Sequence, residues 1–267
     1  MTGGRQGPAS IRVHDATKVF SPGTPNEKTA LRKVDFALED GEFAVVIGSN
    51  GAGKSTLLNA LAGEVLLDSG EILVDGRDVG SQPVYRRAKL ISRVFQDPMV
   101  GTAPELSIEE NLAVAVRRGK RKTFRLGLNR RKREYFRERI SVLGLGLENR
   151  LSEKVRSLSG GQRQSLALIM AALLTPRLML LDEHTSALDP RAAELVLKLT
   201  SDVVTGDKIT TLMVTHNMQH ALRFGTRLFM MHEGGIVLDA PADEKAGLTV
   251  NDLVGRFLVT NDKMLLG

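Results

Sequence analysis

The segment 48–56, GSNGAGKST, has the residue types and the spacing of a phosphate-binding loop. Its pattern, G-x-x-x-x-G-K-[ST], is filled by Gly48, Gly53, Lys54 and Ser55. Glycines let backbone N–H groups curl around phosphate oxygens, and the helix that follows directs its positive end at the anion. The lysine reaches the β- and γ-phosphates, and the serine hydroxyl can bind Mg²⁺. We therefore expect nucleotide contacts from the whole loop: Gly48, Ser49, Asn50, Gly51, Ala52, Gly53, Lys54, Ser55 and Thr56.

An acidic pair, Asp182 and Glu183, follows the apolar run Leu178–Leu181. The run is typical of a buried strand, whose end would present both carboxylates. A carboxylate there, facing the phosphate loop, can hold the Mg²⁺ coordination shell, and the second is placed to orient or deprotonate an attacking water. Found alone, such a pair often marks only a turn. Beside a phosphate loop it indicates nucleotide hydrolysis.

A second anion-binding pattern, LSGGQ at 158–162, comes directly before the apolar helix pattern RQSLALIMAALL. A serine that can cap a helix, two glycines that allow close backbone approach and a helix N-terminus together suit a phosphate. The two helix starts could serve one nucleotide, or two copies of the chain could hold nucleotides between them. The chemistry of these residues leaves both arrangements open.

These motifs lie on alternating strand and helix patterns, which predict an α/β fold with a mostly parallel sheet covered on both sides. Two β-like runs near the N-terminus, with a turn signal at Asp40-Gly41, and a short strand pair around Gly76 predict an N-terminal antiparallel β subdomain. Beyond these, strands are expected at 43–47, 91–95, 178–181 and 211–214, and helices at 56–62, 162–174, 191–203 and 218–223.

The middle of the chain, about 97–157, is charged and has a helical period, as in IEENLAVAV and REYFRERISVLGL. We interpret it as a helical subdomain inserted into the α/β core. Residues 1–10, rich in Gly and Pro, are expected to form a flexible tail. Residues 11–240 would then form a single domain, and 241–267 a C-terminal extension.

Composition narrows the possible functions. The 267 residues are 42% hydrophobic and 25% charged, which is ordinary for a globular protein and argues against dominant disorder. The absence of cysteine excludes disulfides, thiolate metal sites and cysteine nucleophiles. The longest clean apolar run, Leu166–Leu174, has about half the length of a membrane-spanning helix. The N-terminus lacks the apolar stretch of a secretory signal, so we expect a chain that does not enter the membrane by itself.

The net charge of +6 comes from one segment, Arg117–Arg133, which holds ten basic residues and no acidic one. The remaining residues therefore sum to −4, since 6 − 10 = −4. Such a segment can meet nucleic acid, anionic lipid headgroups or an acidic partner, or can simply be a solvated surface. The chain has only two tyrosines and no tryptophan on which bases could stack, so a nucleic-acid partner is not expected.

Taken together, the motifs resemble the ATP-binding subunits of ATP-binding-cassette (ABC) transporters. LSGGQ is that family's signature motif, and Gln96 in VFQDP resembles its Q-loop. Ser186–Asp189, SALD, resembles the D-loop, and His216 in MVTH the switch histidine. Phe20 resembles the aromatic residue that stacks on adenine. The resemblance covers roughly residues 11–240 and implies a P-loop NTPase core that binds ATP with Mg²⁺.

The resemblance also implies a role for each site residue. Glu183 would be the general base, and His216 would contact the γ-phosphate. Gln96 would sense the metal and the attacking water, and Asp182 and Ser55 would complete the Mg²⁺ site. The signature residues would contact the γ-phosphate held by the other subunit of a head-to-tail homodimer: Ser159, Gly160, Gly161 and Gln162.

Two residues depart from the family pattern. His184 stands where the family usually has proline after the acidic pair, and we interpret it as a subfamily trait without a necessary catalytic role. Phe20 stands where tyrosine is commoner. Stacking needs only the ring face, so binding should survive this difference.

The function implied is that of a motor subunit, peripheral at the cytoplasmic face of the membrane, that drives separate permease subunits. DEHTSALDP and FQDP…GTAPELSIEENL resemble a branch of bacterial importers for amino acids or related small solutes, which would include a solute-binding protein. The basic segment would then meet lipid headgroups or acidic permease loops.

The main alternative is a soluble ABC protein that acts on ribosomes or nucleic acid. Such proteins usually carry two cassettes in one chain or a long coiled coil, and neither pattern occurs here. A P-loop kinase or GTPase would leave LSGGQ and His216 unexplained, and no Asn-Lys-x-Asp motif for guanine occurs. The transported solute is not indicated by the sequence.

Overall fold

The computed structural model describes residues 10–119 and 128–262, with side chains as far as residue 257. Its strands form a six-stranded sheet in the order β10-β9-β3-β8-β7-β6 and a four-stranded sheet in the order β2-β1-β4-β5. The predicted α/β fold is confirmed. The predicted N-terminal tail lies outside the described residues apart from Ser10, as do residues 120–127 of the basic segment.

The six-stranded sheet is parallel except at one edge. Its parallel strands are β3 (Phe43–Gly48), β6 (Ile91–Val94), β7 (Leu178–Asp182), β8 (Thr211–Val214) and β9 (Arg227–His232). The edge strand β10 (Gly235–Ala240) pairs with β9 in the antiparallel sense. Four of these strands match the sequence-based expectation, whereas β9 and β10 were not predicted.

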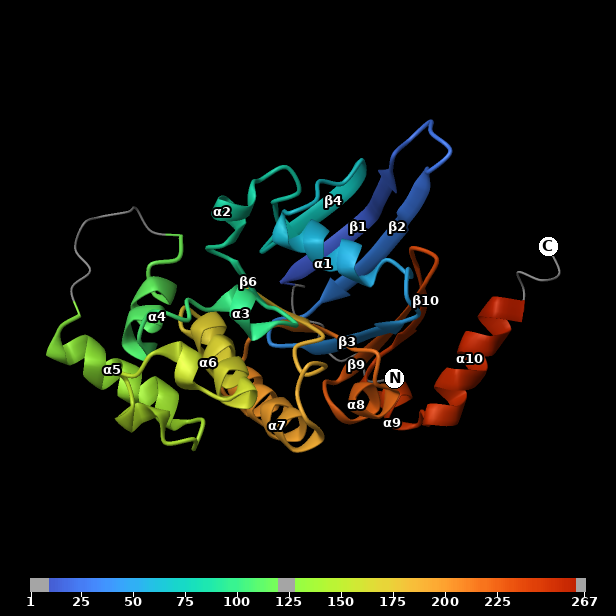
Figure 1. The fold of residues 1–267 in the computed structure, drawn as a ribbon. Coiled ribbons are helices and arrows are strands. Elements are labelled where there is room, and N and C mark those ends of the chain that lie inside the picture. The colour runs from blue at the N-terminus through green and yellow to red at the C-terminus, as the bar shows by residue number, and fades with distance from the viewer. Residues whose placement is uncertain (1–9, 120–127, 263–267) are drawn as a thin grey trace, which may run out of the picture.

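The four-stranded sheet is antiparallel throughout, as expected for the N-terminal part of the chain. It consists of β1 (Ile11–Phe20), β2 (Lys28–Leu38), β4 (Ser69–Val74) and β5 (Arg77–Asp78). Figure 1 shows helix α1 (Lys54–Ala62) between this sheet and β3. The leucines of α1 are buried in a cluster with residues of both sheets, so the helix that follows the phosphate loop is held from two sides.

Strand β3 explains why the protein has two apolar cores. Its side chains alternate between the faces of the sheet, as strand geometry requires. Ala44 and Val46 join the core around α1 and the four-stranded sheet. Val45 and Ile47 join the other core, which includes helices α6 (Gly160–Ala172) and α7 (Pro190–Gly206). Because both faces are covered, the strand is apolar throughout.

The regular elements described between β6 and β7 are helices and 3₁₀ turns, and Figure 1 shows α4 and α5 at one end of the molecule. Apart from an isolated bridge between Ser107 and Lys154, this part contains no strand pairing among its described residues. The remaining helices before residue 240 in the described chain are α2 (Val84–Arg87), α3 (Pro98–Gly101), α4 (Ile108–Ala115), α5 (Arg130–Ser141), α8 (Met218–Arg223) and the 3₁₀ turns Leu147–Asn149 and Val155–Ser157.

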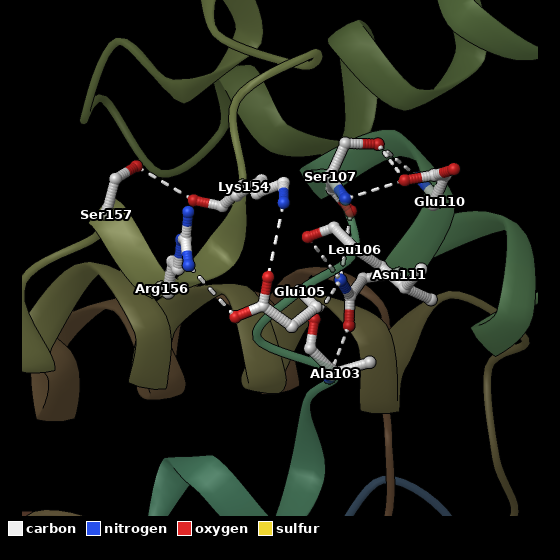
Figure 2. Close-up of polar contacts among 9 residues, drawn as sticks. All are labelled: Ala103, Glu105, Leu106, Ser107, Glu110, Asn111, Lys154, Arg156 and Ser157. Atoms are coloured by element: carbon white, nitrogen blue, oxygen red, sulfur yellow. Dashed lines mark hydrogen bonds and ion pairs between the residues drawn. The ribbon is translucent and has the colours of Figure 1, made fainter.

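Two segments of this helical region are held together immediately before the signature motif. Backbone hydrogen bonds join residues 104–109 to residues 151–156. Figure 2 shows the carboxylate of Glu105 reaching both Lys154 Nζ and Arg156 Nη1, each at 3.2 Å. The buried Asn111 accepts from the Ala103 N–H and donates to the Ala103 carbonyl, and so fixes the loop that leads into the paired segments. The chain after Gln96 is thereby tied to the chain that leads into LSGGQ.

Described residues between 240 and 257 pack against the rest of the protein. Helices α9 (Ala242–Ala246) and α10 (Val250–Asp262) end the described chain, and Leu253 of α10 is fully buried in the larger core. Lys245 Nζ donates to the backbone carbonyls of Phe224 and Gly225, and burial lowers the pKa of this ammonium to about 8. No helix among the described residues is long and apolar enough to cross a membrane.

Candidate active site

At two positions of the phosphate loop a residue with a Cβ atom would clash with backbone atoms. Gly53, immediately before α1, has a φ angle of 102°, and a Cβ there would stand 2.4 Å from the Ala30 carbonyl oxygen. A Cβ on Gly48 would stand 2.5 Å from the Met231 carbonyl oxygen. Both obstacles are backbone atoms and cannot move aside as a side chain can. Both motif glycines are therefore required by close packing, and Gly53 is also required by its positive φ angle.

Lys54 is the buried cation of this loop. Its side chain is only 6% exposed, and Nζ donates to the carbonyls of Gly48 at 2.8 Å and Ser49 at 3.0 Å. Burial lowers the pKa of this ammonium, and the nearby carboxylates of Glu183 and Asp182 partly offset that effect. The ammonium is thus fixed at the start of α1, beside the loop whose amides would surround phosphate oxygens.

A cleft of about 210 Å³ opens beside this loop. Phe20 stands at its edge with 39% of its surface exposed. Two lining residues, Lys28 and Ala30, were not predicted, and Lys28 carried no signal that would separate it from an ordinary surface lysine. The complete lining is Phe20, Lys28, Ala30, Asn50, Gly51, Ala52, Gly53, Lys54, Ser55, Thr56 and Glu183.

Glu183 and His216 meet although they come from different loops. Glu183 follows β7 with a φ angle of 44°, and its N–H donates to the Val214 carbonyl at 3.1 Å. Because β7 and β8 are parallel neighbours, their C-terminal ends lie together. His216, two residues after β8, places Nδ1 3.2 Å from Glu183 Oε2. A second cavity of about 190 Å³ lies at this pair, so Glu183 borders both cavities.

Asp182 is engaged by a residue that the sequence interpretation missed. Arg93 of β6 places Nη2 2.6 Å from Asp182 Oδ2. The signal that could have identified Arg93 is a charge inside the apolar strand pattern ISRVF, because a charged group in a covered strand requires a partner.

Several predicted site residues line neither of these two cavities: Gly48, Ser49, Gln96, Asp182 and the signature residues. Gln96 is exposed just beyond β6, and its side chain makes no hydrogen bond to any described residue. Ser159 is the N-cap of α6, where its Oγ accepts from the Gln162 N–H and the Gln162 side chain accepts from the Ser159 N–H. The residues Ser159, Gly160, Gly161 and Gln162 line neither the loop cleft nor the Glu183–His216 cavity.

His184 is a buried structural residue in this chain. It is 2% exposed, and its Nε2 lies 3.0 Å from Thr200 Oγ1. The Thr200 hydroxyl itself donates to the Val196 carbonyl at 2.8 Å, so Nε2 carries the proton and donates to the hydroxyl oxygen. The contact ties the turn that follows Glu183 to helix α7. Burial, with a smaller contribution from His220, lowers the pKa of His184 to about 4.

This pKa predicts an acid-dependent loss of stability. Unfolded His184 would bind a proton near pH 6.5 and the folded form only near pH 4, so the free energy of unfolding should fall as pH falls through that window. The full effect is up to about 3 kcal/mol. In urea unfolding at pH 7, 6 and 5, His184→Leu should lose stability less steeply than wild type. The exposed His14→Gln serves as control, and a His184→Leu slope equal to that of wild type would contradict the prediction.

The residues of the loop cleft fit a nucleoside triphosphate with Mg²⁺. The glycine-dependent loop and the buried ammonium suit phosphates. Ser55 lines the cleft and offers a hydroxyl oxygen to the metal, whereas Asp182 offers a carboxylate oxygen from outside that lining, directly before Glu183. Among the described residues there is no cluster of three or more histidines and carboxylates that could hold a metal. Proteins usually bind Mg²⁺ through one or two side chains together with the phosphates of the substrate, and Ser55 and Asp182 would supply those side chains here.

Comparison with known proteins shows where this fold and site belong. Residues 31–186 match the family model described as ABC transporter. The chain is 46% identical over 247 residues to a "Tyrosine transport ATP-binding protein" of Clostridioides difficile. The aligned residues cover 92% of this chain and 98% of that protein. It is 32% identical to "Energy-coupling factor transporter ATP-binding protein EcfA2" of Acetivibrio thermocellus, over 87% of this chain and 80% of that one.

Solved structures agree with the sequence comparison. The dimeric post-hydrolysis form of the ATP-binding cassette MJ0796, bound to ADP and Pi, superposes with a TM-score of 0.73 at 26% identity. The match covers 87% of this chain and 98% of that one. The ADP conformation of the cassette MJ1267 superposes with a TM-score of 0.76 at 22% identity, over 95% and 99% of the two chains, and supports the fold. The chain therefore belongs to the ABC transporter family and is an ATP-binding cassette, an enzyme that binds and hydrolyses ATP.

Proposed function

We propose that this ATPase is the motor subunit of an importer for an amino acid or a related small solute. One observation carries the proposal: the 46% identity to a relative named for tyrosine transport extends over nearly the full length of both chains. The relatives at about 30% identity are also named as ATP-binding proteins of transporters. Residues 11–240 would form the ATPase domain, with 97–157 as its helical subdomain and 241–267 as a C-terminal extension.

In the proposed site, the phosphate loop and Lys54 hold the phosphates, and Phe20 stacks on the adenine. Ser55 and Asp182 would hold Mg²⁺, with Gln96 reaching the same site when the cassette closes. The metal would supply charge neutralisation on the β- and γ-phosphates. The conformation of the loop supports this assignment, because its glycines are required by packing and Lys54 is already fixed beside it.

Glu183 would act as the general base. It borders the loop cleft, so its carboxylate can accept a proton from a water that attacks the γ-phosphate. His216 would contact the γ-phosphate, and its 3.2 Å contact to Glu183 supports a shared role for the two side chains. Substitution of either residue should affect hydrolysis more than ATP binding.

The signature residues would complete the site of a second copy. In one copy they line neither cavity, whereas they form an exposed, capped helix start suited to a phosphate. A head-to-tail homodimer would bring Ser159, Gly160, Gly161 and Gln162 to the γ-phosphate held by the partner copy. The dimeric form of the related MJ0796 cassette supports this arrangement.

The partners would be integral permease subunits and a solute-binding protein, with this chain on the cytoplasmic face of the membrane. The test is uptake of radiolabelled tyrosine and other amino acids by cells that contain the complete system with wild-type or Glu183→Gln subunits. Uptake of one amino acid class that depends on Glu183 would support the proposal. Uptake that is equal in both strains would refute the motor role.

The basic segment would strengthen association with anionic lipid headgroups or acidic permease loops. The arginines of this segment that the structure describes differ in their environment. Arg133 forms two hydrogen bonds to Glu109, whereas the side chain of Arg130 is 94% exposed. We expect Arg130→Gln/Arg131→Gln to co-sediment less with anionic vesicles or permease-containing membranes, at unchanged ATP affinity. Arg12→Gln/Arg77→Gln removes the same charge from the four-stranded sheet and serves as control. Equal sedimentation of both variants and wild type would refute this role.

A further inference from the structure

Arg93 of β6 connects this strand to helix α1 and strand β7. Its Nη2 contacts Asp182 Oδ2 at 2.6 Å, at the end of β7. Its Nη1 contacts Asn59 Oδ1 of α1 at 2.8 Å and Glu64 Oε2, just beyond α1, at 2.9 Å. One guanidinium therefore joins the helix that follows the phosphate loop to the strand that presents the acidic pair.

The guanidinium is also held in place by burial. The Arg93 side chain is 11% exposed, and its guanidinium lies over the Phe95 ring at 4.9 Å from the centroid. Its Nε is buried and has no hydrogen-bond partner among the described residues. Placing a charge here has a desolvation cost that an apolar residue would avoid, as Ile91 and Val94 do in the same strand. A purely structural tie between α1 and the sheet does not require a charge, but a fixed carboxylate does benefit from one.

The contact with Asp182 uses one carboxylate oxygen. Asp182 Oδ2 accepts from Arg93, and Oδ1 takes part in no hydrogen bond or ion pair with the described residues. A carboxylate whose second oxygen is anchored by a planar donor has a restricted orientation, and its other oxygen stays available to a ligand.

We propose that Arg93 is a positioning residue for the ATPase reaction, which holds the Asp182 carboxylate by Oδ2 so that Oδ1 can accept from the hydrated cation of the nucleotide. The inference rests on the proposed role of Asp182 in the Mg²⁺ site. Arg93 itself would touch neither the nucleotide nor the cation.

The charge of Arg93 and its positioning role predict opposite changes in cation affinity when Arg93 is replaced, and this difference makes the inference testable. Arg93, Asp182 and Glu64 together carry a formal charge of −1, and removal of the guanidinium changes it to −2. If Arg93 acted only through its charge, its loss would tighten cation binding, since opposite charges attract more strongly. If Arg93 acts by orienting Asp182, its loss should weaken cation binding.

The experiment measures binding of Mn²⁺ by electron paramagnetic resonance, with the chain saturated by a non-hydrolysable ATP analogue. Arg93→Met retains the side-chain length without the charge and should weaken Mn²⁺ affinity about 10-fold or more, the usual effect of losing a residue that orients a metal ligand. Glu64→Gln removes the other ion pair of Arg93 but leaves the contact to Asp182, and should change the affinity less than about threefold. Arg93→Lys, which can still donate to Asp182, should fall between wild type and Arg93→Met.

The outcomes distinguish a failure of the positioning role of Arg93 from a failure of the proposed role of Asp182 in the Mg²⁺ site. Unchanged or tighter Mn²⁺ binding by Arg93→Met would overturn the positioning role, as would an equal loss in Glu64→Gln. If Asp182→Asn also leaves Mn²⁺ affinity unchanged, the proposed role of Asp182 itself fails. Thermal unfolding of each variant shows whether the fold is retained, and if Arg93→Met does not fold, the comparison of Arg93→Lys with Glu64→Gln decides the question.

Discussion

Glu183→Gln is expected to lower the rate of ATP hydrolysis by about 10²- to 10⁴-fold, the range typical for loss of a general base. Glutamine has the same shape as glutamate, but its amide cannot accept a proton from the attacking water. Glu183 borders the loop cleft and contacts His216 at 3.2 Å, so the substitution changes the proton acceptor and leaves the phosphate loop intact. ATP affinity should therefore change little.

The same variant should also convert the chain from monomer to dimer in the presence of ATP and Mg²⁺, but not of ADP. Stalled hydrolysis would retain the nucleotide that joins the two copies, and light scattering would detect the change in mass. Glu194→Gln removes an exposed carboxylate paired with Arg223 and should retain wild-type hydrolysis. A Glu183→Gln rate within a few-fold of wild type would exclude Glu183 as the base, whatever the oligomeric state.

Lys54→Met is expected to weaken ATP binding by about 30-fold or more. Truncating one partner of a buried, hydrogen-bonded charge pair costs about 2–5 kcal/mol, and each 1.4 kcal/mol corresponds to about tenfold in affinity. The Lys54 ammonium is nearly buried and is fixed beside the phosphate loop by two backbone carbonyls. Isothermal titration with ATP would measure the loss.

The stability of the nucleotide-free variant provides an independent check. Burial lowers the pKa of Lys54, which shows that the charged form is disfavoured where it stands. Methionine removes this desolvation cost but also the hydrogen bonds to the Gly48 and Ser49 carbonyls, so the free energy of unfolding should change much less than the free energy of ATP binding. Lys28→Met removes an exposed lysine of the same cleft and should have a much smaller effect on ATP affinity. Equal losses in both variants would mean that general charge attraction, and not the fixed ammonium, binds the phosphates.

The sequence by itself determined the features that depend on local residue types. The loop at 48–56 could be predicted because its glycines and lysine follow a buried strand and begin a helix, and the structure has β3 and α1 in those places. Strands β6, β7 and β8 were predictable because short apolar runs between turn signals have few alternatives. Strands β9 and β10 were not predicted, and their place in the sheet depends on pairing of β9 with the distant β3.

Only the tertiary structure decided which of these residues meet. Glu183 and His216 are 33 positions apart, and Arg93 and Asp182 are 89 apart. Their contacts follow from the order of the parallel strands, which brings the C-terminal ends of β6, β7 and β8 to one edge of the sheet. Strand order is set by burial and packing summed over the whole chain, so no local pattern contains it. The sequence therefore determined which types of chemical group occur at the site, whereas the fold determined which groups contact each other. Glu183 contacts a histidine, Asp182 an arginine, and His184 a buried threonine.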